Sequence, residues 1–209
     1  MRQLTLIVFC AAAFAADPPE PGFTSLFNGR DLEGWTKSKE NEASISVDQG
    51  AIKANGPRCI VYYTGPFQNH TFRNFELRVD ILTKPNSNGG IHIMTEYQET
   101  GWPQKGVEIQ VNNSYERDFR KTGSIYEIAD IREKLAEDDQ WFTESVIVKD
   151  NTITVFLNGK KVNEWTQPPD WQGTKGWPGR VIRPGTIAFQ AHDPGSTVYY
   201  KNVRIKPLP

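Results

Sequence analysis

Three large polar side chains alternate with apolar residues in two nearby runs of the sequence. In residues 90–94 (GIHIM), His92 lies opposite the two isoleucines of an extended strand. In residues 107–112 (VEIQVN), Glu108 and Gln110 alternate with valine and isoleucine. Because a half-buried strand turns its apolar set toward the core, we expect these three side chains on an open sheet surface. An acid, an amide and an imidazole on such a surface indicate a binding site for a sugar or another polyol.

A second pair of polar residues occurs near the C-terminus. Gln190 and His192 share one face of a predicted strand, opposite Ile187 and Phe189. Histidine titrates near neutral pH, so His192 is a candidate for passing a proton to a leaving group. Glu108 is the candidate catalytic carboxylate, as a base or as a metal ligand. Solvated charges and cross-strand hydrogen bonds are the ordinary alternatives for such residues.

The tripeptide Gly-Trp-Pro occurs twice, at residues 101–103 and 176–178, each time in a predicted loop. An aromatic ring stacks well on the apolar face of a pyranose, so Trp102 and Trp177 are candidate sugar platforms. The two loops could flank one groove or be two unrelated packing corners. Of the remaining tryptophans, Trp35, Trp141 and Trp165 are expected in the core.

Residues 122–128 (TGSIYEI) predict a further strand that leads away from this face, in which Tyr126 could donate its hydroxyl to a sugar. Glu127 would then point to the opposite side, because both cannot line one groove on a regular strand. Glu108 with His92 or His192 is a candidate set of ligands for one divalent ion, although no compact His/Asp spacing requires one. No cofactor is demanded by the sequence.

The composition limits the protein class. The 24 Lys and Arg residues nearly balance the 25 Asp and Glu residues, which gives no basic footprint for nucleic acid. Residues 1–15 have the positive start, apolar run and Ala-x-Ala end of a cleavable signal peptide, and residues 16–21 form a proline-rich leader. We therefore expect a secreted or periplasmic protein without a membrane span after cleavage. One cysteine, Cys59, then remains, within an apolar strand where a buried inert thiol is expected.

The mature part, residues 22–209, reads as one all-β domain. About eleven short alternating segments with turn signals between them predict a sandwich of two antiparallel sheets. Residues 72–82 form the longest clean strand, and Asn158-Gly159 is the strongest hairpin signal. The only predicted helix is residues 130–139, two turns at most.

Several motifs of the chain occur together in one order, and together they resemble the 3-keto-disaccharide hydrolase domain family. The resemblance covers residues 22–206 and rests on GFTSLFNGRDLEGW, NSNGGIHI, GVEIQV, TGSIYEI, Trp141, FLNGKKV, IAFQAHD and YYKNVRIK. It implies a concanavalin-like or laminarinase-like jelly roll with the ligand on a concave sheet. It also implies activity on 3-keto-glycosides, which a separate sugar 3-dehydrogenase would supply. Two departures are notable: Met94 stands where the family usually has an arginine, and FQAHD stands where it commonly has LQDHG.

A ketone at carbon 3 acidifies the hydrogen at carbon 2, so that the glycosidic oxygen at carbon 1 can leave by elimination and water can add back. Such chemistry needs a base, donors for the enolate oxygen and an acid for the leaving oxygen. A non-catalytic, lectin-like module on the same fold is the main alternative. A laminarinase-like hydrolase would carry Glu-x-Asp-x-x-Glu, whereas residues 108–113 (EIQVNN) hold one carboxylate, which disfavours that reading.

Overall fold

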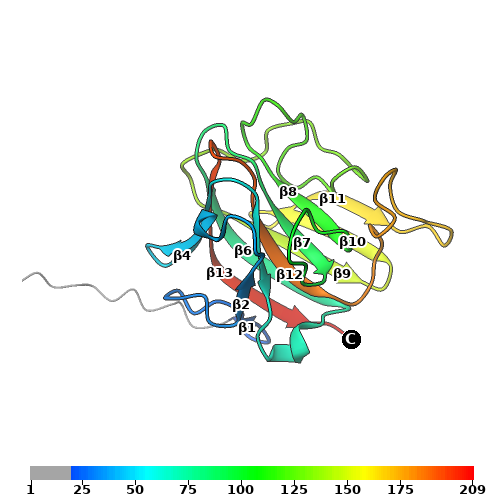
Figure 1. Ribbon diagram of the computed structural model, residues 1–209. Coiled ribbons are helices and arrows are strands. Elements are labelled where there is room, and N and C mark those ends of the chain that lie inside the picture. The colour runs from blue at the N-terminus through cyan, green and yellow to red at the C-terminus, as the bar shows by residue number, and fades with distance from the viewer. Residues whose placement is uncertain (1–19) are drawn as a thin grey trace, which may run out of the picture.

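The computed structural model describes residues 20–209, so the predicted signal peptide and most of the leader lie outside the described residues. Two antiparallel sheets pack face to face (Figure 1). One has eight strands in the order β11-β10-β9-β6-β13-β4-β3, with β1 also paired to β13, and the other has the order β2-β5-β12-β7-β8. The expected jelly-roll sandwich is confirmed.

The strand bounds follow the alternation of the sequence closely. The eight-stranded sheet consists of β1 (Thr24–Ser25), β3 (Ile45–Asp48), β4 (Ala51–Asn55), β6 (Phe75–Thr83), β9 (Phe142–Lys149), β10 (Thr152–Leu157), β11 (Lys160–Thr166) and β13 (Thr197–Pro207). The five-stranded sheet consists of β2 (Trp35–Lys37), β5 (Cys59–Tyr63), β7 (Gly89–Thr95), β8 (Val107–Val111) and β12 (Thr186–Ala191). Two 3-10 turns, η1 (Glu42–Ser44) and η2 (Phe67–His70), complete the elements.

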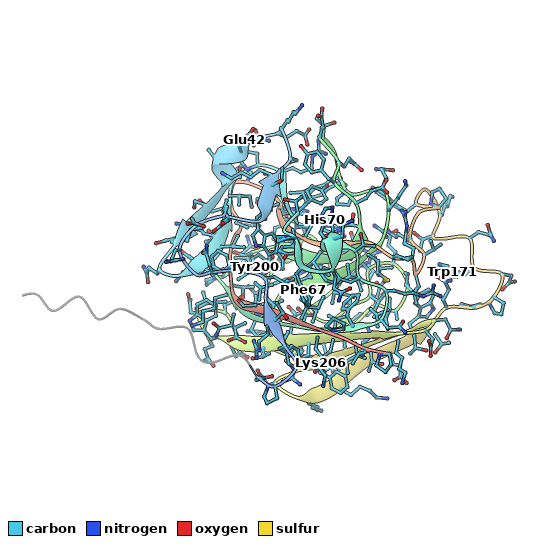
Figure 2. The ribbon with its side chains drawn as sticks, turned by 90° about the horizontal axis from the view of Figure 1, so that it is seen from below. Glu42, Phe67, His70, Trp171, Tyr200 and Lys206 are labelled. Carbon is cyan, nitrogen blue, oxygen red and sulfur yellow. The ribbon has the colours of Figure 1, made fainter. Side chains whose placement is uncertain are left out.

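The core lies between the two sheets. Alternate residues of β6 are buried in it, and the β13 side chain Tyr200 stacks on Phe189 of β12 with ring centroids 4.3 Å apart. Figure 2 shows Tyr200 in the interior of the molecule. Cys59 is buried in this core, and burial raises the pKa of its thiol, as expected for an inert cysteine.

The five-stranded sheet turns its second face away from this core. The apolar residues Ile91, Ile93 and Ile109 point into the sandwich, so their neighbours His92, Glu108 and Gln110 emerge on the outer face. On β5 and β12, a small apolar cluster of Ile60, Tyr62 and Ala188 covers the rest of that face, with Trp102 packed against it. The outer face is therefore half polar and half apolar.

The segment between β8 and β9 differs from the sequence predictions. Residues 130–139 form no helix, because side chains and strand edges bind their backbone: Asn113 donates to the carbonyl oxygen of Glu137, and the amide of Asp139 donates to that of Thr83. Residues 122–128 do not lead away but run irregularly beside β8, where Tyr126 N donates to Glu108 O at 3.0 Å. Tertiary contacts thus override local preference here.

One expected core tryptophan is misplaced. Trp35 is buried and Trp165 is half-buried, but Trp141 is exposed, with the ammonium group of Lys201 3.9 Å from its ring centroid. It precedes β9 and lies outside the alternation that buries Phe142. Among residues 20–209, no helix is long and apolar enough to cross a bilayer.

Candidate functional site

A cavity of about 170 Å³ opens on the polar half of the five-stranded sheet. Its floor comes from β7, β8 and β12, and its walls come from Asn88, just before β7, and from the loops after β7, β8, β11 and β12. The lining residues are Asn88, His92, Trp102, Pro103, Gly106, Glu108, Gln110, Tyr126, Glu127, Trp177, Arg180, Gln190 and His192. All eight site residues expected from the sequence are among them.

Three side chains of the floor form one hydrogen-bonded chain. Gln190 Nε2 donates to Glu108 Oε1 at 3.0 Å, and Gln190 Oε1 lies 2.9 Å from His92 Nε2. Since the amide nitrogen is used on Glu108, the amide oxygen accepts, and His92 must donate from Nε2. Burial lowers the pKa of His92 to about 4, so its ring is neutral and its single proton is committed to this bond.

The Glu108 carboxyl group is poised to titrate near neutral pH. Burial raises its pKa to about 7, although the charge of Arg180 and the hydrogen bond from Gln190 both oppose that rise. The carboxylate lies over Gly90, where an added β-carbon would be 2.6 Å from Glu108 Oε1 and 2.9 Å from Gln190 Nε2. The missing side chain at Gly90 is thus what makes room for Glu108.

Polar atoms without partners mark the neighbouring part of the cavity. The side chain of Gln110 is fully buried, yet within the described part of the chain neither its Nε2 nor its Oε1 has a hydrogen-bond partner. The Oδ1 atom of Asn88, also buried, is unpartnered in the same sense. A buried amide group without a hydrogen bond lowers the stability of the fold unless water or a ligand forms that bond. Both residues line the cavity, so they can bind the hydroxyl or carbonyl groups of a ligand.

His192 is held by an acidic neighbour just past the end of β12. Its Nδ1 donates to Asp193 Oδ2 at 2.8 Å, which leaves Nε2 free for the cavity. Burial alone would raise the pKa of Asp193, but hydrogen bonds from Ser196, His192 and the Gly195 amide outweigh it and hold that pKa below its usual range. A carboxylate that orients an imidazole in this way favours the histidine as a proton donor or acceptor.

The two Gly-Trp-Pro loops contact each other. The amide of Gly106 donates to the carbonyl oxygen of Gly179 at 3.0 Å, and an added β-carbon on Gly179 would collide with the Gln104 backbone. Trp102 lies beside His192 with ring centroids 5.4 Å apart. The loops therefore flank one cavity, which resolves the alternative that the sequence leaves open.

Tyr126 and Glu127 both line the cavity, contrary to the expectation that they point to opposite sides. The backbone of Glu127 has φ of 60°, so the segment is not a regular strand and the alternation fails there. The hydroxyl of Tyr126 donates to Asp118 Oδ2 at 3.0 Å, so its proton is already engaged. Desolvation is the largest cause that raises the pKa of Tyr126, which keeps the phenol neutral.

Sequence reasoning missed Arg180, Asn88, Asp118 and Asp193. Arg180 belongs to a long loop without periodicity, so no pattern marked it, whereas the His192-Asp193 dipeptide could have shown the acidic partner. Met94, at the place of the family's arginine, has φ of 56° and packs in the core rather than in the cavity. Within residues 20–209, no three His, Cys, Asp or Glu side chains gather as a metal-ligand set.

Several solved structures share the architecture of this chain. A candidate glycosyl hydrolase from Parabacteroides distasonis is 26% identical with a TM-score of 0.75, over 90% of this chain and 94% of that one. The carbohydrate-binding module CBM66 from Bacillus subtilis is 11% identical with a TM-score of 0.60, over 83% and 95%. SCLam, a non-specific endo-beta-1,3(4)-glucanase from family GH16, is 12% identical with a TM-score of 0.57, over 89% and 91%. The last two show the fold alone.

No curated protein matches the chain by sequence. The family described as the 3-keto-alpha-glucoside-1,2-lyase-like domain matches residues 22–206, nearly the whole described part of the chain. This match agrees with the resemblance seen in the ordered motifs. It supports a carbohydrate-active, glycoside-directed function, and the chain belongs to the 3-keto-alpha-glucoside-1,2-lyase-like domain family.

Proposed function

We propose that this protein is an exported enzyme that cleaves the glycosidic bond of 3-keto-glycosides by elimination, followed by addition of water. The observation that carries the proposal is the state of Glu108, a cavity carboxyl whose pKa is raised to about 7 and whose partner among the described side chains is the Gln190 amide. A group with this pKa can accept a proton at neutral pH and release it again.

In the proposed reaction, Glu108 removes the proton from carbon 2 of the sugar. The electron pair of that C–H bond forms a double bond to carbon 3, and the ketone becomes an enolate. The enolate then re-forms the ketone, a double bond forms between carbons 1 and 2, and the bond from carbon 1 to the glycosidic oxygen breaks. In this step His192 acts as the imidazolium: it gives its Nε2 proton to the leaving oxygen and becomes neutral, while its Nδ1 proton stays on the hydrogen bond to Asp193. The products are an alcohol and an enone, to which water adds at carbon 1.

The rest of the cavity has the chemistry to hold such a substrate. The unpartnered amides of Gln110 and Asn88 suit the sugar's hydroxyl groups, and Trp102 and Trp177 offer aromatic surfaces. The ketone must come from another enzyme that oxidises carbon 3 of the sugar, so a sugar 3-dehydrogenase is the expected functional partner. Export rests on the signal-like residues 1–15.

The test is to incubate the mature protein with 3-keto-trehalose and with unmodified trehalose, each with and without a chelator. Products are followed by mass and by the ultraviolet absorbance of an enone. We expect cleavage of the keto sugar alone, and loss of that cleavage in the presence of chelator would add a metal to the mechanism.

The matched variant Glu108→Gln should keep the fold and lose about 10²–10⁴-fold in rate. If a panel of keto-glycosides is bound but not cleaved, the protein is a lectin-like module instead.

A further inference from the structure

Arg180 is a buried cation in the wall of the cavity that the proposed chemistry has not yet used. It is 8% exposed and lines the cavity together with Glu108. Burying a guanidinium group is costly unless it is paired, and the carboxylate of Glu127 pairs with Arg180 at 2.6 Å. That ion pair uses only the Nη1 atom of the guanidinium group.

The local structure holds Arg180 in one place. Its Nη1 donates to Glu127 Oε2 at 2.6 Å and to the carbonyl oxygen of Tyr126 at 3.3 Å. The guanidinium carbon lies 4.8 Å from the ring centroid of Trp177 and 5.1 Å from that of Tyr126. On the backbone, the indole of Trp171 donates to the Arg180 carbonyl oxygen at 2.8 Å. Such a fixed donor is preorganised for a ligand.

Part of the guanidinium group remains available. Both side-chain hydrogen bonds of Arg180 in the described part of the chain use Nη1, so Nε and Nη2 are not engaged by another residue there. No ion pair joins Arg180 to Glu108 within residues 20–209, yet Arg180 is the charged group that most strongly lowers the pKa of Glu108. The two groups are thus neighbours that do not form an ion pair with each other.

This arrangement matches what enolate formation requires. Carbon 2 and the ketone at carbon 3 are adjacent atoms, so the base and the group that stabilises the enolate oxygen must lie close together without pairing. Two other donors near Glu108 are already engaged: His92 donates to Gln190, and Gln190 donates to Glu108 itself. The hydroxyl of Tyr126 likewise already donates its proton to Asp118. The Gln110 amide has no partner among the described residues, but it carries no charge.

Resting on the proposed function, we propose that Arg180 is a catalytic residue that binds the ketone oxygen of the substrate and stabilises the enolate formed when Glu108 removes the proton from carbon 2. The broken C–H bond leaves its proton on Glu108, and the carbonyl electron pair moves onto the oxygen facing Arg180. When the glycosidic bond breaks, that pair returns to the carbonyl, so Arg180 itself exchanges no proton. A permanent cation is suited to this role because it holds the developing charge without a change in its own protonation.

The test separates enolate formation from bond cleavage. The probe is 1,5-anhydro-3-ketoglucitol, which has the ketone and the carbon 2 hydrogen but no leaving group at carbon 1. Exchange of that hydrogen in deuterated water, followed by NMR, reports on deprotonation alone. We compare the wild type with Arg180→Met, Arg180→Gln and Arg180→Lys, and check each fold by thermal melting. The matched control is Arg183→Met, a change in the same loop at an arginine that pairs with Glu96.

We expect Arg180→Met to slow exchange by about 10²–10³-fold, as for the loss of one oxyanion donor. Arg180→Lys should lose less of the exchange rate, and added guanidinium ion should restore part of the rate of Arg180→Met. Arg183→Met should exchange the hydrogen as fast as the wild type.

If Arg180→Met does not fold, the comparison of Arg180→Gln with Arg180→Lys tests the role of Arg180. Wild-type exchange in a folded Met or Gln variant overturns the role of Arg180. Equal losses in all three variants without rescue would assign it to loop structure instead. A wild type that neither exchanges the probe nor cleaves any keto-glycoside overturns the proposed function itself.

Discussion

The carboxylate of Glu108 lies directly over Gly90, so close that a β-carbon at position 90 would be 2.6 Å from its Oε1 atom. Glu108 and Gly90 belong to the neighbouring strands β8 and β7, and Gly90 is paired with Gln110 across the ladder. The orientation of the proposed base thus depends on a residue that contributes no side chain.

Replacing Gly90 with alanine should impair the reaction more than the fold. The added methyl group displaces the carboxylate and the Gln190 amide, and we expect at least a tenfold loss in kcat from a misplaced base. The contrasting variant is Gly89→Ala, whose β-carbon would point into the core, 2.7 Å from the Tyr200 hydroxyl oxygen. That variant should cost about 1–3 kcal/mol of stability through overpacking. Steady-state kinetics and urea unfolding of both variants measure the two effects. A Gly90→Ala variant that loses stability but keeps its kcat would contradict the prediction.

The pH dependence of the reaction should follow the ionisation of Glu108. A base works only when deprotonated, and burial raises the pKa of this group to about 7. We therefore expect kcat/KM to rise with pH up to about 7, and the contribution of Glu108 to level off above that pH. Initial rates on a keto-glycoside from pH 5 to pH 9 measure it. A rate that is flat across pH 7 would remove Glu108 as the base.

His192 and Asp193 should affect the leaving group in particular. If His192 protonates the leaving oxygen, His192→Ala will slow substrates with poor leaving groups most, whereas a uniform loss would indicate a binding or metal role. Asp193→Asn removes the carboxylate that accepts the hydrogen bond from His192 Nδ1. Its rate on the substrates with poor leaving groups should fall by roughly 10²-fold. A series of 3-keto-glycosides whose leaving alcohols differ in pKa provides the measurement.

Glu144 should destabilise the protein as the pH rises. Its carboxyl group is fully buried in the core, neither oxygen has a partner among the described residues, and desolvation raises its pKa well above 4.5. The folded state keeps the proton while the unfolded chain releases it above about pH 4.5, so stability falls with rising pH until the folded pKa is reached.

We therefore expect Glu144→Met to be more stable than the wild type, by a margin that widens by up to about 1.4 kcal/mol per pH unit above pH 4.5. Urea unfolding at pH 5, 6 and 7 measures the margin. The control is Glu133→Met, a change at an exposed position, which should show no such trend. A margin that stays constant with pH would mean that Glu144 is ionised in the folded protein.

The regular strands, their polar face and the two tryptophan loops were predictable, whereas Arg180 and the orientation of Glu127 were not. Period-two alternation placed His92, Glu108 and Gln110 on one face because β7 and β8 are regular ladders. The side of Glu127 was predicted wrongly because its positive φ breaks that period. Arg180 could not be predicted, since its place depends on long-range contacts of an aperiodic loop rather than on local spacing.

The hydrogen bond between Gly106 and Gly179 has a consequence for engineering the protein. The aromatic wall of the cavity is built from two loops that contact each other at Gly106 and Gly179, without space for a side chain at Gly179. Neither loop can be lengthened or exchanged alone without losing that closure. Residues 96–106 and 167–185 should therefore be exchanged together, as a matched pair of loops, in any attempt to change which sugars this scaffold accepts.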